Sequence, residues 1–308
     1  MKDAELNNFD VLLSGYCPSA ELVEQVGQIA RERKMAASLK PGSFFWALDP
    51  VMGDNGRLYV AEETVPAYKS LLQDADLILP NQFEAELLSD VKIHDLASMR
   101  EAIAKLHTAY QVPHVLITSI RLPPTQASTP NVETEHPAYP ASFAKLSVVG
   151  SSATSSGQPR LFRITIPALP VFFSGTGDMF SAILVARLRQ AASEANVLNQ
   201  ASWRSADDVA APDLPLAKAA AKVLASMHVI LKDTAEHYDR AAQEWTTGMQ
   251  LNEGSGQDAN EHIEMEKHLR LTRAAEVRVV RNARALLDPV NIEDFAAQAI
   301  DTEEIAGT

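Results

Sequence analysis

Two glycines flank a threonine at Gly175-Thr176-Gly177, and Asp178 follows where an apolar run with helical spacing begins. Glycines let a phosphate approach the backbone, and the N–H groups at a helix N-terminus attract anions. Asp178 would then stand beside a phosphate, where a carboxylate can take the proton of an attacking hydroxyl. The alternative is a glycine-rich turn that Asp178 closes as a helix N-cap. This stretch alone does not separate the two interpretations.

Two better-known phosphate motifs are absent. The sequence contains no GxxxxGK[ST], so a P-loop is excluded. The stretch GTGDMF lacks the third glycine of GxGxxG, so a Rossmann dinucleotide site is not expected.

A pair of carboxylates lies in the stretch DPVMGDNGRLYV, residues 49–60, which follows a predicted buried strand. Asp49 and Asp54 bracket a turn there, and two carboxylates near a crevice can hold Mg²⁺ through water, as magnesium nucleotides are usually bound. The alternative is a solvated turn, because Asp54-Asn55-Gly56 are typical turn residues.

Polar residues also follow the next two predicted strands. Asn81 and Glu84, in LPNQFEAELL, have the spacing of a capping box, which is a purely structural interpretation. The functional alternative places both side chains near a nucleotide phosphate and its metal. Thr118 and Ser119 end the run HVLITS and are either a plain strand end or part of the same crevice.

Strands and helices alternate along the chain. Strands are predicted over 9–14, 44–48, 76–80, 114–119 and 161–169, and helices over 19–34, 64–73, 81–90, 94–110, 178–192 and 214–235. This order predicts an α/β fold with a doubly wound, mostly parallel sheet and helices on both faces. Asp49, Asn81 and Thr118 fall at predicted carboxyl ends of strands, where such sheets bind their ligands. We therefore expect them to line one crevice.

Two stretches break this rhythm. Residues 123–160 are rich in proline, serine and threonine and are predicted to be a surface insertion, with a possible strand at 144–150. Residues 246–262 are expected to be a loop with little structure. With no internal repeat and no second composition class, residues 1–308 are expected to form a single domain.

Composition limits the class of protein. The 308 residues are 46% apolar and 22% charged, which predicts a globular fold, and the net charge of −13 disfavours nucleic acid and anionic membranes as partners. A phosphate site must then come from local geometry. Cys17 is the single cysteine and cannot form an internal disulfide, which fits a reducing compartment. With no apolar run of about 18 residues and no signal peptide at the start, a cytoplasmic protein is expected.

Five stretches, in this order, closely resemble the pyridoxal kinase family of the ribokinase superfamily. They are Gly15-Tyr16, DPVMGDNGRLYV, ILPNQFEAELL, VLITS and FSGTGDMFSAIL, and the resemblance runs from about residue 5 to about residue 192. It implies a ribokinase-like fold. It also implies ATP-dependent transfer of the γ-phosphoryl group to the 5′-hydroxymethyl of pyridoxal, pyridoxine or pyridoxamine.

The resemblance also implies roles for individual residues. Asp178 would be the general base, and Gly175, Thr176 and Gly177 would form the anion hole. Asp54 would lie at Mg²⁺ with support from Glu84. The nucleotide would be faced by Asn81, Thr118, Ser119, Tyr59 and Asp49, the vitamin by Tyr16 and Asp178, and a monovalent cation, K⁺ or Na⁺, by Asp49 and Thr118. Leu79 stands where the family usually has a hydroxyl near that cation. Family members are commonly dimers, so a homodimer is possible.

Members of the family normally carry a further segment ahead of the part that resembles residues 1–16. The resemblance therefore predicts an N-terminally truncated chain with half of the vitamin pocket missing, an exposed strand edge and weak kinase activity. Two alternatives stay open: a non-catalytic remnant that binds nucleotide or vitamin, and a kinase for another hydroxymethyl heterocycle or a sugar. Asp178 beside an intact GTG favours an enzyme.

Overall fold

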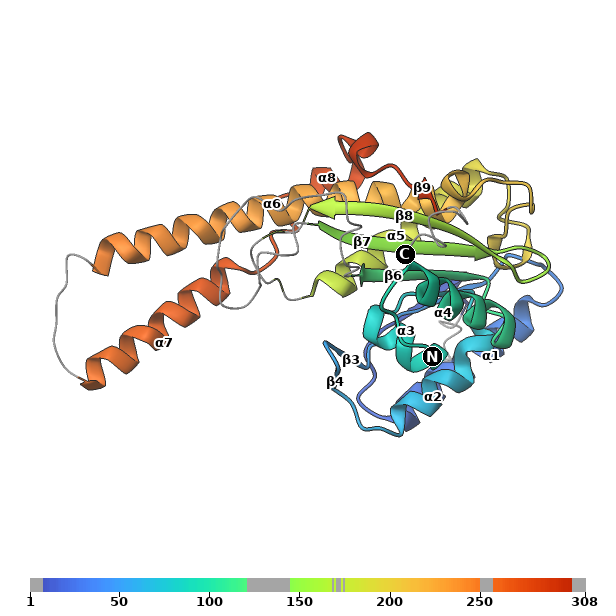
Figure 1. The fold of residues 1–308 in the computed structure, drawn as a ribbon, viewed down its shortest axis with the longest axis horizontal. Helices are drawn as coiled ribbons and strands as arrows, with labels where there is room; N and C mark the ends of the chain where they lie inside the picture. Colours follow the sequence, from blue (N-terminus) through green and yellow to red (C-terminus); the bar gives the residue numbers. More distant parts are fainter. Residues whose placement is uncertain are drawn as a thin grey trace.

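A seven-stranded sheet forms the centre of the computed structural model (Figure 1). The structure describes residues 8–120, 145–167, 169, 173, 175–249 and 257–300. The strands, in their order across the sheet, are β1 (Val11–Ser14), β2 (Phe45–Leu48), β5 (Leu77–Ile78), β6 (His114–Ile120), β7 (Lys145–Ala153), β8 (Pro159–Pro167) and β9 (Gln298–Ala299).

The pairing of neighbouring strands changes once across the sheet, from parallel to antiparallel. β1, β2, β5 and β6 pair in parallel, whereas β7, β8 and β9 join by antiparallel pairing. Because β8 is reversed twice relative to β6, the two strands run in the same direction. The carboxyl ends of β1, β2, β5, β6 and β8 therefore meet at one edge of the sheet. The predicted α/β class is confirmed, with an antiparallel section on one side.

Helices cover both faces of the sheet, as predicted. One layer is formed by α1 (Ala20–Ala37), α2 (Thr64–Leu71), α3 (Gln82–Ser89) and α4 (Leu96–Ala109). The other contains α5 (Thr176–Glu194) and α6 (Pro215–Met249). β2 is buried on both sides: Trp46 and Leu48 pack into the first layer, while Phe45 and Ala47 pack into the second. This is the alternation of side chains that a strand requires.

Local sequence signals explain where several helices begin. The Ser19 side chain accepts a hydrogen bond from the Leu22 amide at the start of α1, as the sequence predicts. Asn81 and Glu84 form the predicted capping box of α3, and Asp95 caps α4. These side chains satisfy amides that the first turn of a helix leaves without partners.

Within the predicted insertion at 123–160, the strand expected at 144–150 is confirmed, but the loop expected at 151–160 is wrong. Residues 145–153 and 159–167 are the long antiparallel strands β7 and β8, while residues 121–144 lie outside the described part. The serines that suggested a surface loop have buried partners: Ser151 bonds to His107 at 2.8 Å and Ser152 to His114 at 2.7 Å. Serine-rich composition is compatible with a buried strand when each hydroxyl is paired.

The expected loop at 246–262 is also wrong in part. α6 continues to Met249, and α7 (Gln257–Ala274) returns beside its outer half to form an arm that projects from the sheet (Figure 1). An ion pair between Arg270 and Glu244, at 2.8 Å, joins the two helices. The remaining elements are the short helix α8 (Ala283–Leu287) and single-turn 3-10 helices. Among the described residues no helix has the length and apolar character needed to cross a membrane.

Candidate active site

The stretch Gly175–Asp178 forms the start of α5 at the carboxyl edge of the sheet, just after β8. Gly175 is the N-cap residue and has a φ of 77°, a left-handed conformation that glycine adopts without strain. Thr176, Gly177 and Asp178 make the first turn, with Asp178 exposed. The interpretation of Asp178 as the N-cap is therefore wrong. Its carboxylate instead lies in the turn where amide groups and the helix dipole favour negative charge.

The end of β1 approaches Asp178 from the side. A Cβ atom placed on Gly15 would lie 3.8 Å from Oδ1 of Asp178. Tyr16, the predicted vitamin contact, follows directly and is 56% exposed. The Gly15 carbonyl accepts a hydrogen bond from the buried Tyr68 hydroxyl at 3.3 Å and one from the Cys17 thiol at 3.6 Å. Asp178 and the Gly15-Tyr16 turn thus share one location.

Asp49 lies at the end of β2, beneath the same turn of α5. Its carboxylate is 7% exposed and accepts a hydrogen bond of 2.6 Å from the Ser181 hydroxyl, while its amide donates to the Ser14 carbonyl at 2.8 Å. Burial raises the pKa of Asp49 to about 6; the Ser181 hydroxyl opposes this rise, and the negative charge of Asp178 adds to it. The negative charge of Asp178 therefore disfavours ionisation of Asp49.

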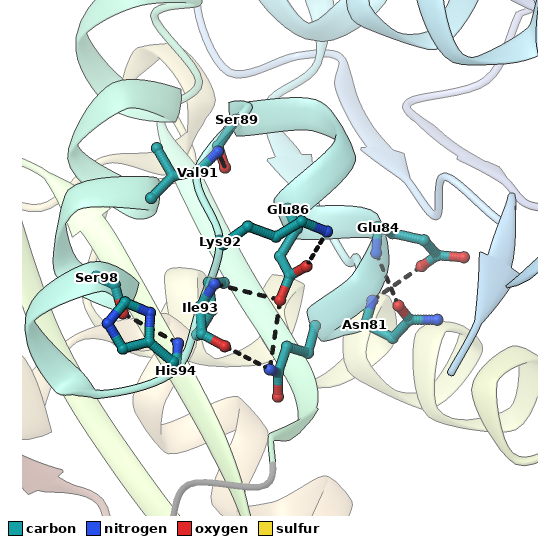
Figure 2. A network of polar contacts seen from close by, with 10 residues as sticks. Asn81, Glu84, Glu86, Ser89, Val91, Lys92, Ile93, His94 and Ser98 are labelled. Carbon is teal, nitrogen blue, oxygen red and sulfur yellow. Dashed lines mark hydrogen bonds and ion pairs between the residues drawn. The ribbon is translucent and has the colours of Figure 1, made fainter. Parts of the chain in front are cut away.

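Asn81 and Glu84 hold a second part of the site, the hairpin of β3 (Gly53–Asp54) and β4 (Arg57–Leu58). Oε1 of Glu84 accepts from the amides of Met52 at 2.9 Å and Gly53 at 3.3 Å, and Oε2 accepts from the Asn81 amide at 2.9 Å. The Asn81 side chain accepts from the Glu84 amide at 2.9 Å and donates to the Gly53 carbonyl at 2.7 Å. The capping box therefore also anchors the hairpin, and Figure 2 shows the two residues at the start of α3.

Glu84 is buried, with 3% of its surface exposed. Burial raises its pKa to about 7, the three amide donors oppose that rise, and the charge of Asp49 adds to it. Because both carboxylate oxygens already accept backbone hydrogen bonds, Glu84 fixes the hairpin. The charge of Asp49 links this cluster to the one around Asp178.

The connection from α3 to α4 is held separately. Glu86 accepts from the Ile93 amide at 3.2 Å and pairs with Lys92 at 2.8 Å (Figure 2). The Gln82 side chain also donates to the Ile93 carbonyl at 2.9 Å, so the connection after α3 is held against the first half of the helix.

Thr118 and Ser119 lie beside Asn81, as predicted. Asn81 and Thr118 form a parallel bridge, and the Thr118 amide donates to the Pro80 carbonyl at 3.0 Å. Ser119 is exposed at a bulge of β6 and has a φ of 56°, a left-handed conformation unusual for a residue other than glycine. Such strained positions cluster at functional sites.

Asp54 and Tyr59 lie on the hairpin side of the site. Asp54 is exposed and accepts from the Asn55 amide at 2.7 Å and the Asn55 side chain at 2.9 Å. Tyr59 is 63% exposed. No group of three His, Cys, Asp or Glu side chains in the described residues is arranged to hold a metal ion. One exposed carboxylate does suit Mg²⁺ that is carried by phosphates and water.

Ser181 and Tyr68 were missed from the sequence. Ser181 follows Gly177 by four residues, so helical spacing could have placed it on the same side of α5. Tyr68 gave no such signal, because its partner, the Gly15 carbonyl, is 53 residues away.

Comparison with known proteins agrees with this architecture. Residues 21–142 match the family model for phosphomethylpyrimidine kinase. A putative pyridoxal kinase of Schizosaccharomyces pombe is 32% identical over 233 residues, covering 76% of this chain and 64% of the relative. Pyridoxal kinase of Arabidopsis thaliana is 30% identical over 238 residues, covering 77% of this chain and 62% of the relative. The chain thus spans less than two thirds of the length of these two curated relatives.

A solved structure, pyridoxal kinase of Leishmania donovani in complex with ADP and pyridoxamine, superposes with a TM-score of 0.64 at 26% identity. The match covers 97% of this chain and 76% of that one. The fold and the site at its carboxyl edge define a member of the ribokinase superfamily. Within the superfamily, the proteins to which the chain is similar are pyridoxal kinases.

Proposed function

We propose that the protein phosphorylates the 5′-hydroxymethyl group of pyridoxal, pyridoxine or pyridoxamine, with ATP as phosphoryl donor. The observation that carries the proposal is the position of Asp178. It lies exposed in the first turn of α5, behind the left-handed Gly175 and beside Gly15-Tyr16. The sequence relatives named as pyridoxal kinases, and the related structure with ADP and pyridoxamine, support this choice of substrates.

In the proposed reaction, Asp178 accepts the hydroxyl proton as the vitamer oxygen attacks the γ-phosphorus and ADP leaves. The amides of the first turn of a helix have no acceptor within the helix, so those of Thr176, Gly177 and Asp178 can donate to the oxygens of the transferring group. A phosphoryl transfer of this kind depends mainly on positioning and on charge neutralisation. Tyr16, exposed beside Gly15, would contact the vitamer ring.

Mg²⁺ would supply the charge neutralisation at the phosphates. We propose Asp54 as the residue that holds it, directly or through water, because Asp54 is exposed on the hairpin. Glu84 would support it by fixing the hairpin through the amides of Met52 and Gly53. Thr118 and Ser119, at the carboxyl end of β6, would face the nucleotide. A monovalent cation near Asp49 and Thr118 remains a proposal.

The same edge offers room for the nucleoside. A hollow of about 150 Å³ lies between the end of β8, at Pro167, and His228 and Val229 of α6; Val290 and Phe295 add apolar walls, and Asn291 and Asp294 add polar groups. We propose that it receives part of the ATP nucleoside, since small-molecule sites combine apolar walls with a few polar groups.

The test is an assay of the full chain with each vitamer and MgATP, in which the 5′-phosphate product and ADP are both quantified. Asp178→Asn keeps the size of the side chain and removes its basicity. We expect it to lower kcat by about 10²–10⁴-fold, the usual contribution of a general base, while ADP binding measured by calorimetry is retained.

The outcomes separate the alternatives. Equal turnover by the Asp178→Asn variant would refute the assignment of the base. A wild-type chain that binds ADP and converts no vitamer would favour the non-catalytic alternative. Faster turnover of a hydroxymethylpyrimidine or a sugar would redirect the substrate class. Light scattering on the same sample tests whether the chain forms a homodimer.

A further inference from the structure

The Ser181 hydroxyl lies between the end of β2 and the first turn of α5, two parts of the site whose relative position the proposed reaction depends on. It is 3% exposed and lies 2.6 Å from Oδ2 of Asp49 and 2.9 Å from the carbonyl oxygen of Gly177. The first group belongs to the end of β2. The second belongs to the first turn of α5, one residue before Asp178.

Within the part of the chain that the structure describes, few other contacts fix the turn that Ser181 contacts. Its N-cap, Gly175, has no side chain and makes no capping hydrogen bond. A Cβ atom placed on Gly175 or on Gly177 would meet nothing within 4 Å. Two glycines in four residues leave the backbone with more conformational freedom than any other residues would.

Asp49, by contrast, is firmly placed. Its amide donates to the Ser14 carbonyl at 2.8 Å, which extends the pairing of β2 with β1, and its side chain is buried. A short hydrogen bond from a hydroxyl to a carboxylate is stronger than one between neutral groups. The hydroxyl of Ser181 has one proton, and the shorter contact, to the Asp49 carboxylate, ties the start of α5 to the rigid sheet, with the Gly177 carbonyl as the second acceptor within reach.

We infer that Ser181 is a positioning residue, which sets the first turn of α5 and the Asp178 carboxylate against the carboxyl edge of the sheet. Its effect on catalysis rests on the proposed function. Its effect on the order of the turn does not, and the two are measured separately. A misplacement of about 1 Å at a reacting group can cost about 10²-fold in rate.

The test compares Ser181→Ala with Ser151→Ala. Ser151 is 0% exposed and bonds to His107 at 2.8 Å, so both variants remove the hydroxyl partner of a buried titratable side chain. Ser151 pairs in register with Val115 near the start of β6, at the edge of the sheet opposite Asp178. Both variants should therefore lose some overall stability, but only Ser181→Ala should have a local effect on α5.

Two measurements, of turnover and of hydrogen exchange, test whether Ser181 positions the first turn of α5. We expect Ser181→Ala to lower kcat for the vitamer about tenfold while KM for ATP stays within about twofold, and Ser151→Ala to change neither. Hydrogen exchange at the amides of Met179 and Phe180 should accelerate about tenfold in Ser181→Ala alone, because the first turn opens more often.

Unchanged exchange at these amides in Ser181→Ala, or equal acceleration in both variants, would overturn the inference whether or not the protein is a kinase. Faster exchange with unchanged kcat would also overturn it, because Asp178 would then not depend on Ser181. If wild-type protein converts no vitamer, the proposed function fails, and the exchange comparison still decides whether Ser181 fixes the turn.

Discussion

Two buried histidines should make the protein lose stability in mild acid. His107 and His114 are 3% and 4% exposed, and both ring nitrogens of each have a partner. Burial lowers the pKa of each from 6.5 to about 4; the carbonyls of Val112 and Ser202 oppose this, and the charges of Arg160 and Arg204 add to it.

The direction of the change in stability depends on whether the folded or the unfolded state binds more protons. Below pH 6.5 the unfolded chain protonates these histidines while the folded chain does not, so stability present above that pH is lost as the pH falls towards 4. With a pKa of 6.5 in the unfolded chain and about 4 in the folded chain, each histidine lowers the unfolding free energy at pH 5 by about 2 kcal/mol, and the pair lowers it by about 4 kcal/mol. Asp49 and Glu84 act in the opposite sense, because their pKa values are raised.

The contribution of the histidines is isolated by comparison with a double variant, His107→Asn with His114→Gln. Each replacement keeps an amide donor for the carbonyl that the ring now faces and cannot be protonated. Urea unfolding at pH 7.5 and pH 5 gives the change in unfolding free energy for both proteins. We expect the wild type to lose about 4 kcal/mol more than the variant over this range. Equal losses would refute the reasoning.

Three further predictions concern stability and the site. Glu84→Ala leaves three backbone amides without their acceptor and should lower the unfolding free energy by about 3 kcal/mol or more, measured in urea; a loss below about 1 kcal/mol would contradict its anchoring role. Tyr68→Phe removes the hydrogen bond to Gly15 and should cost about 1 kcal/mol, with no pH dependence below pH 9 because burial raises the pKa of Tyr68 far above its usual value. Trp203→Ala should lower the unfolding free energy by about 3–5 kcal/mol, measured by thermal or urea unfolding, because Trp203 is buried and its ring stacks on Phe45 with centroids 4.1 Å apart. A loss as small as that at a surface site would show that the stack contributes little.

Local signals explain what could be predicted from the sequence. The capping box at Asn81 and Glu84 depends on residues three apart, and α3 begins where that spacing predicts. The end of β2 before Asp49 and the pairing of Asn81 with the end region of β6 agree with the sequence, because buried parallel strands are short apolar runs that polar residues follow, whereas β6 continues past Thr118 to Ile120.

The failures involve partners distant in the sequence. Ser151 and Ser152 suggested a surface loop because their partners, His107 and His114, are 44 and 38 residues away. The cap stayed open as an alternative for Asp178 because the sequence does not show that Gly175 already occupies that position. The sequence assigned Glu84 to metal support, which stays a prediction, and only the fold shows that its oxygens accept from three backbone amides.

The double-sided burial of β2 couples the two helical layers in unfolding. Phe45 and Ala47 belong to one apolar cluster, and Trp46 and Leu48 to the other. Unfolding of either helical layer would therefore expose one face of the same four-residue strand to water. Cooperative loss of both layers in a single transition follows. The chain carries its own reporters of this, since Trp46 is buried in one cluster and Trp203 in the other, and their fluorescence should change at one denaturant concentration.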